Sequence, residues 1–122
     1  SMEVGQGVCH SELIVSVCSY IDNNLSEDLS LERLSAMAKV SSSYLRKAFR
    51  SEMQITVKEY VDRRKIATAK QLLKSRDMKV QEVASRLGFY YSQSFIAFFK
   101  TMVGMTPGEY QAQFVDPQGP DG

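Results

Sequence analysis

The strongest constraint on the fold of this chain is an internal repeat in the positions of its apolar and capping residues. Forty-nine residues separate Leu31, Leu34, Ala38 and Val40 from Val80, Val83, Leu87 and Phe89. Fifty residues separate Leu45, Phe49 and residues 56–60 from Phe95, Phe99 and residues 106–110. The one-residue difference falls in a turn, where insertions are tolerated best. The chain therefore contains two similar units, each a short helix, a tight turn and a second helix, which is the shape of a helix-turn-helix motif.

Apolar residues recur with the 3.6-residue period of amphipathic α-helices along most of the chain. Residues with helix-capping chemistry stand in front of several of these segments. The predicted N-caps are Ser30, Ser41 and Ser92, the capping boxes are Thr56 with Glu59 and Thr106 with Glu109, and Gly88 and Gly104 end helices. We therefore predict an all-α fold of about seven helices, in which two helix-turn-helix subdomains are joined by a long linker helix.

The same periodicity predicts which side chains face inward. In the second helix of each unit these are Tyr44, Leu45, Ala48 and Phe49, and then Phe95, Phe98, Phe99 and Met102, with Phe89 in the turn before. Cys18 is expected to be a small buried apolar residue. Ser35 and Ala84 are small residues in the first helix of each unit, where the second helix can cross closely.

Positive charge is concentrated in the middle of the chain, although the formal net charge is only +1. Residues 41–76 contain ten basic and three acidic side chains, whereas residues 1–40 contain two basic and six acidic ones. Such a segment is typical of a protein that binds a polyanion, but it also suits a solvated helix face. A linker helix of about 19 residues would be roughly 28 Å long, which is compatible with second helices that enter major grooves ~34–36 Å apart.

Several motifs resemble those of the AraC/XylS family of transcription regulators. The resemblance covers roughly residues 12–114, and it is carried by residues 41–49, 60–73, 83–89, 95–100 and 104–110. The most specific part is the spacing of Gly88-Phe89, Phe99-Lys100 and Gly-x-Thr-Pro-x-x-Tyr at residues 104–110. The resemblance implies two helix-turn-helix units that contact successive major grooves of duplex DNA. The chain departs from the family pattern at Gln54, where glycine is usual, at Tyr91, where a small polar or acidic residue is frequent, and at Ala97, where arginine is frequent.

The resemblance also indicates which residues contact DNA. The expected DNA-binding residues are Ser42, Ser43, Arg46, Lys47 and Arg50 in the first unit and Ser92, Gln93, Ile96, Ala97 and Lys100 in the second. Arginine can bind O6 and N7 of guanine together, glutamine can bind adenine in the same way, and apolar side chains can contact the thymine methyl. For each of these residues a contact with the phosphate backbone, or a solvated surface position, is the alternative.

The domain layout follows from the repeat and the resemblance. Residues 1–10 are expected to be a disordered N-terminus or the remnant of a tag or linker, because Ser1-Met2 resembles a cloning remnant. Residues 11–114 form the double helix-turn-helix DNA-binding domain, with a first unit at about 11–55, the linker helix at about 57–75 and a second unit at about 79–114. Residues 115–122 are rich in Pro, Gly and Asp and are expected to be a disordered tail.

No sequence pattern indicates catalysis, because the chain has one histidine and no phosphate loop, metal-ligand spacing or nucleophile arrangement. We therefore expect a cytoplasmic protein that is no enzyme, needs no cofactor and contacts no membrane. The expected partner is double-stranded DNA, with RNA polymerase as a second partner if the protein is an activator. This domain is expected to be monomeric, and the full-length protein could dimerise through a domain missing here. The alternative function is a helical protein–protein interaction module, which DNA binding that weakens steeply with salt would exclude.

Overall fold

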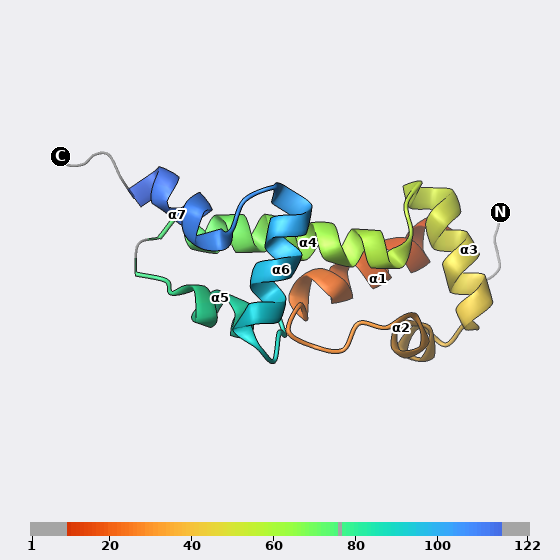
Figure 1. The fold of residues 1–122 in the computed structure, drawn as a ribbon. Helices are drawn as coiled ribbons and strands as arrows, with labels where there is room; N and C mark the ends of the chain where they lie inside the picture. Colours follow the sequence, from red (N-terminus) through yellow and green to blue (C-terminus); the bar gives the residue numbers. More distant parts are fainter. Residues whose placement is uncertain (1–9, 76, 116–122) are drawn as a thin grey trace. The chain divides into compact units, whose positions relative to one another are not determined.

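The structure is a computed structural model that describes residues 10–75 and 77–115, and every regular element in those ranges is an α-helix (Figure 1). The helices of these ranges are α1 (His10–Asn23), α2 (Leu31–Ala38), α3 (Ser42–Met53), α4 (Val57–Leu73), α5 (Val80–Arg86), α6 (Ser92–Val103) and α7 (Pro107–Val115). They form two compact units: unit 1 ends at Arg63 and unit 2 begins at Arg64, so the boundary falls inside α4. The prediction of an all-α fold with two helix-turn-helix subdomains and a long connecting helix is confirmed.

Unit 1 is built around a core to which α1, α2, α3 and the first half of α4 contribute. The three first helices contact one another pairwise. The buried apolar residues of this unit are Leu13, Ile14, Val17, Ile21, Leu25, Leu34, Leu45, Ala48, Phe49, Val57 and Val61. At the edge of this core the Tyr60 hydroxyl donates a hydrogen bond to the Asp22 carboxylate at 3.1 Å, and this contact ties α4 to α1.

Unit 2 has a core of its own, to which the second half of α4 contributes together with α5, α6 and α7. Its buried residues are Ile66, Ala69, Leu73, Val83, Ala84, Leu87, Phe95, Phe99 and Pro107. The rings of Phe95 and Phe99 lie 5.8 Å apart, and Phe99 in turn meets Tyr110 edge to face at 5.6 Å. The matching pair in unit 1, Phe49 and Tyr60, has the same edge-to-face arrangement at 5.7 Å. The sequence repeat is therefore also a repeat of aromatic packing. Both pairs have the edge-to-face geometry that aromatic rings commonly prefer.

The turn between the first and second helix of each unit is closed by an equivalent backbone hydrogen bond. In unit 1 the Val40 N–H donates to the Ser35 carbonyl at 3.0 Å, and in unit 2 the Phe89 N–H donates to the Ala84 carbonyl at 2.9 Å. Ser35 and Ala84 are only 4% and 1% exposed. Both small residues are therefore buried within their helix pair, in agreement with the prediction that they lie where the second helix crosses closely.

The second helix of each unit ends in the left-handed conformation. Gly104 has φ +96° and its N–H donates to the Lys100 carbonyl at 2.8 Å. Gln54 has φ +68° and its N–H donates to the Arg50 carbonyl at 2.9 Å. The glutamine that departs from the family pattern therefore adopts the conformation for which glycine is usually chosen, and its side-chain amide donates a further hydrogen bond to the Ser51 carbonyl at 2.9 Å.

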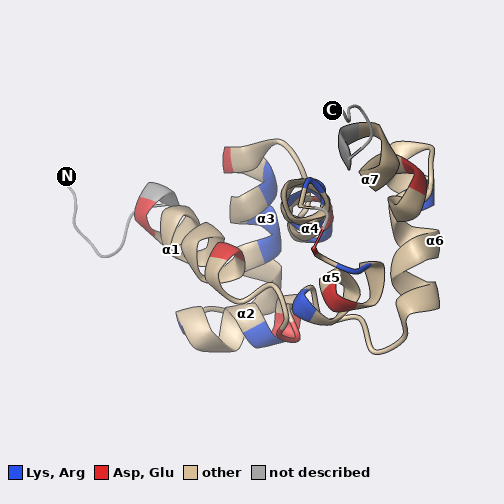
Figure 2. Cartoon of the chain, turned by 90° about the vertical axis from the view of Figure 1, so that its left-hand side faces the viewer, with Lys and Arg blue, Asp and Glu red and all other residues tan. Residues whose placement is uncertain are grey.

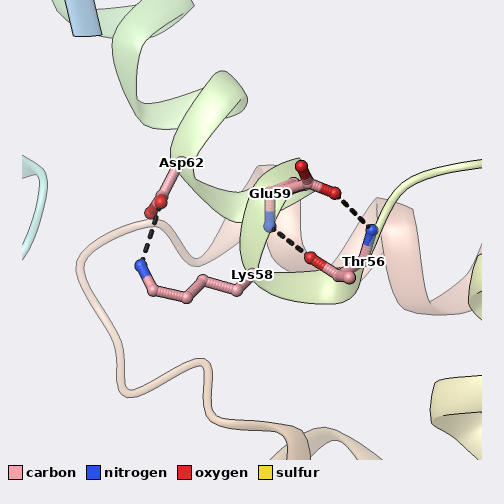
Figure 3. A network of polar contacts seen from close by, with 4 residues as sticks. All are labelled: Thr56, Lys58, Glu59 and Asp62. Atoms are coloured by element: carbon pink, nitrogen blue, oxygen red, sulfur yellow. Dashed lines mark hydrogen bonds and ion pairs between the residues drawn. The ribbon is translucent and has the colours of Figure 1, made fainter.

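Both predicted capping boxes are present. The Thr56 hydroxyl accepts from the Glu59 N–H at 3.1 Å, and the Glu59 carboxylate accepts from the Thr56 N–H at 2.9 Å (Figure 3). Thr106 and Glu109 repeat these two bonds at 3.1 and 2.9 Å. The hydrogen bond from the backbone N–H of the threonine is the main reason why the pKa of each glutamate carboxyl is lowered. The start of α4 and the start of α7 are therefore fixed by the same local chemistry.

The two simple N-caps predicted for unit 1 are confirmed, and the one predicted for α6 is wrong. The Ser30 and Ser41 hydroxyls accept hydrogen bonds from the backbone N–H groups of Arg33 and Tyr44. In α6 the N-cap is Tyr91, which makes no side-chain capping bond. Ser92 is already the first helical residue, so its hydroxyl cannot take the place of a cap.

Several side chains expected inside are more exposed than predicted. Tyr44 and Met102 are 43% and 44% exposed, because they lie at the margin of the buried stripes of α3 and α6. Phe89, Phe98 and Cys18 are half-buried. Burial is still enough to raise the pKa of the Cys18 thiol, which argues against a reactive thiolate.

The two ends predicted to be disordered, residues 1–10 and 115–122, lie outside the described residues, apart from His10 and Val115, with which α1 begins and α7 ends. Within the described ranges we find no helix long and apolar enough to cross a membrane.

Candidate nucleic-acid interface

Helix α3 is held in place by local contacts at its start and by apolar contacts along one side. The Ser41 hydroxyl caps it, and the Ser42 hydroxyl lies 3.0 Å from the hydroxyl of Ser35 on α2. Its inner side is formed by Leu45, Ala48 and Phe49, each at most 3% exposed. A helix whose inner side is anchored in this way presents its opposite side rigidly, which base recognition requires.

The opposite side of α3 gathers four of the five residues predicted to contact DNA in unit 1. Ser43, Arg46, Lys47 and Arg50 are all exposed, and their spacing of three or four residues makes them neighbours on one helix surface. Ser42, the fifth, is half-buried, and its hydroxyl is engaged with Ser35. We name the exposed group Ser43, Arg46, Lys47 and Arg50 the α3 face.

The positive charges of the α3 face are available to a partner. Among the described residues, neither Arg46 nor Lys47 forms an ion pair with a carboxylate. Arg50 is close enough to Glu59 to help lower the pKa of that carboxyl, after the hydrogen bonds from Thr56. Figure 2 shows the basic residues of α3 in blue along the helix. A planar guanidinium and an ammonium without internal partners are suited to base edges and phosphates.

The nearby cation Lys58, which precedes Glu59 in the α4 capping box, is different. Its ammonium group lies 2.9 Å from the Asp62 carboxylate, one turn further along α4 (Figure 3). The Lys58 side chain is 82% exposed, so the pair contributes little to stability. It does neutralise the charge locally, which sets Lys58 apart from the cations of the α3 face.

Helix α6 presents the corresponding residues of unit 2, but with little charge. Gln93, Ala97 and Lys100 are exposed, whereas Ser92 and Ile96 are half-buried. We name these five residues the α6 face. Lys100 is the only charged residue in α6, and in Figure 2 the rest of the helix is tan. The α6 face therefore offers an amide and apolar surface, together with one cation.

Two exposed aromatic residues directly before α6 were not among the predicted contacts. Tyr90 is 89% exposed and Tyr91 is 65% exposed, and their rings lie 4.8 Å apart, edge to face. The sequence carried a signal for them, namely two adjacent tyrosines in a turn where one already departs from the family pattern. Their exposure depends on the turn geometry, which the repeat alone did not supply.

Comparison with known proteins identifies the class to which this fold and these two exposed faces belong. A family model described as a helix-turn-helix domain matches residues 34–113. The probable transcriptional regulator LumQ of Photobacterium leiognathi is 35% identical over 98 residues, which are 80% of this chain and 40% of that protein. The chain thus spans less than half the length of this relative, and 37% of another, the regulatory protein PocR of Salmonella typhimurium, to which it is 29% identical.

Two solved structures have the same fold. The DNA-binding domain of AdpA, a global transcriptional factor crystallised in complex with a target DNA, is 28% identical with a TM-score of 0.77, over 87% of this chain and 97% of that one. The C-terminal domain of AraT, a response regulator from Geobacillus stearothermophilus, is 25% identical with a TM-score of 0.82, over 89% and 91%.

Fold, sequence match and structural neighbours agree on one class, the DNA-binding domains of transcription regulators. This chain belongs to the AraC-type helix-turn-helix family. The resemblance found in the sequence is therefore confirmed, and so is the prediction that the chain is not an enzyme, since this is a family of DNA-binding domains without catalytic function. The relatives named here are bacterial, in agreement with the prediction.

Proposed function

We propose that this chain binds duplex DNA sequence-specifically as the DNA-reading part of a bacterial transcription regulator, with α3 and α6 in successive major grooves. The observation that carries the proposal is the α3 face, whose cations are exposed and lie on one side of a capped helix. Within residues 10–75 and 77–115, Arg46 and Lys47 of this face form no ion pair. Support comes from the family and from the similar DNA-binding domain of AdpA, which was crystallised in complex with a target DNA.

We propose that the α3 face and the α6 face contribute unequally to sequence specificity. On the α3 face, Arg46 reads guanine, Ser43 and Lys47 contact bases or phosphates, and Arg50 contacts a phosphate. An Arg–guanine pair contributes about 1–3 kcal/mol of discrimination. The hydroxyl of Ser42 fixes the helix at the margin of this face.

On the α6 face, Gln93 is proposed to read adenine, Ile96 and Ala97 to contact a thymine methyl, and Lys100 to contact a phosphate. Ser92, at the start of this face, is proposed to contact the sugar-phosphate backbone of the DNA. Apolar contacts with a methyl group discriminate less than a bidentate hydrogen bond, so α3 is expected to dominate specificity.

The proposal extends to the layout and partners of the whole protein. We assign a first unit at about 11–55, a linker helix at about 57–75 and a second unit at about 79–114. Because the two units are unlike and lie in one chain, the domain binds as a monomer and needs no palindrome. If the full-length protein dimerises, it does so through another part of its chain. If the protein is an activator, RNA polymerase is its second partner. Binding to a bacterial chromosome implies a cytoplasmic protein.

The test is equilibrium binding, measured by fluorescence anisotropy, to a duplex selected from a random pool with this chain and to a scrambled duplex of the same length. We expect tighter binding to the selected duplex, affinity that falls steeply with salt, and a footprint over two successive major grooves. The matched control is Lys58→Ala, which removes an exposed cation that is already paired and should leave affinity unchanged. Equal affinity for both duplexes, a footprint of one groove, or a strict need for an inverted repeat would contradict the proposal.

A further inference from the structure

Among the described residues of unit 2, the most exposed large hydrophobic side chains are the two tyrosines in front of α6. Tyr90 is 89% exposed and Tyr91 is 65% exposed, with their rings edge to face at 4.8 Å. Two neighbouring aromatic rings in water leave a large apolar surface without burial. They directly precede the α6 face in the chain, since Ser92 and Gln93 follow them.

The repeat shows that neither tyrosine has a tyrosine counterpart in unit 1. Val40 matches Phe89 and Ser41 matches Tyr91, so Tyr90 is the additional residue of the second turn. Tyr91 occupies the N-cap position, which in unit 1 is filled by Ser41 with its capping hydrogen bond. An N-cap serine is more stabilising than a residue without a capping group, by roughly 1 kcal/mol. Local stability therefore does not explain this pair.

A shortage of charge on α6 suggests what the pair does. The α3 face has three cations, whereas Lys100 is the only charged residue of α6. Tyrosine can contact the DNA backbone without charge, since its hydroxyl donates to a phosphate oxygen and its ring packs against the sugar. Such a contact releases no counterions, in contrast to a contact from lysine or arginine.

We propose that Tyr90 and Tyr91 form an uncharged contact with the sugar-phosphate backbone of duplex DNA beside the groove that α6 enters. This inference rests on the proposed function and adds two residues to it. The pair gives unit 2 a salt-independent anchor in place of the cations that unit 1 uses. Because sugars and phosphates are common to all sequences, the contact strengthens binding to every duplex and carries no base preference of its own.

The test measures the dissociation constant at several salt concentrations for the selected and the scrambled duplex. The variants are Tyr90→Ala, Tyr91→Ala, the double alanine variant and the double phenylalanine variant. We expect the double alanine variant to bind both duplexes about tenfold more weakly, the effect of one hydrogen bond to a charged group. The slope of log affinity against log salt should not change. The phenylalanine variant should lose part of the affinity, because it keeps the rings and lacks the hydroxyls.

The matched control is Met102→Ala, which removes an exposed apolar side chain from α6. Met102 lies on the side of α6 away from Gln93 and Ala97. It should leave DNA binding unchanged, and thermal melting verifies the fold of every variant. Wild-type affinity in the double alanine variant would overturn the inference and point to a protein partner for the pair. A slope lowered by about one, or a loss confined to the selected duplex, would also overturn it. Absence of duplex binding by the wild-type chain would instead refute the proposed function itself.

Discussion

The substitution Gly104→Ala tests how the end of a recognition helix is stabilised. Gly104 has φ +96°, and no described atom lies within 4 Å of the position that an added Cβ would take. The methyl group therefore meets open space, and the whole effect must come from the backbone. Holding an L-residue in the left-handed region costs about 1–2 kcal/mol. The smaller entropy of the unfolded alanine chain returns about 0.4–1 kcal/mol. We expect a net loss of about 1 kcal/mol.

The structure provides a control four residues further along. Gly108 lies in α7, also with no described atom within 4 Å of an added Cβ, and without a positive φ. Gly108→Ala should therefore stabilise the fold, by up to about 1 kcal/mol. Both variants are measured by thermal and urea unfolding with far-UV circular dichroism. If they shifted the midpoint in the same direction, the argument that backbone conformation decides the sign would be refuted.

Three further predictions concern the core, the reading residues and a capping box. Phe99→Ala should destabilise the protein by about 3–5 kcal/mol, because Phe99 is fully buried between other rings; a melting temperature near wild type would contradict this. Arg46→Ala should weaken binding to the selected duplex by about 1–3 kcal/mol and relax the preference at one base pair, whereas Ala97→Arg should add affinity for all duplexes. If Arg46→Ala lowered the affinity for every sequence equally, Arg46 would be a phosphate contact. If Gln93→Ala lost more specificity than Arg46→Ala, the ranking of the two faces would be reversed. Because the pKa of the Glu59 carboxyl is lowered in the folded protein, its charged form stabilises the fold above the usual carboxyl pKa, and this stabilisation is lost as pH falls through the lowered pKa. Glu59→Gln should therefore flatten the acid side of the curve of melting temperature against pH.

The elements that the sequence predicted best are those fixed by local chemistry. The capping boxes depend on two side chains three residues apart, and each forms its pair of hydrogen bonds as expected. The paired turns follow in the same way from small residues at matched positions. Such features need only a few neighbouring residues and no knowledge of the rest of the fold.

The predictions that failed concern residues at margins, where a shift of one position changes the outcome. Ser92 has the chemistry of a cap, but α6 begins one residue earlier than expected, so Tyr91 takes the cap position. Tyr44 and Met102 belong to apolar stripes by their spacing, yet each lies at the edge of its stripe. Periodicity defines the direction of a stripe more sharply than its width.

The DNA contacts remain predictions of a different kind. The structure shows that Arg46 and Gln93 are exposed on α3 and α6, but the base that each would meet depends on the DNA. No periodicity in a protein sequence contains that information, and the selected duplex has to supply it.

The constant offset of fifty residues between α3 and α6 gives the molecule a modular character. Buried positions of the two helices correspond pair by pair, as Phe49 and Phe99 do, while several exposed positions differ in chemistry, as Lys47 and Ala97 do. Because the exposed residues take no part in the cores, their identities can be exchanged without rebuilding either unit. A duplicated unit of this kind can acquire new operators one half at a time.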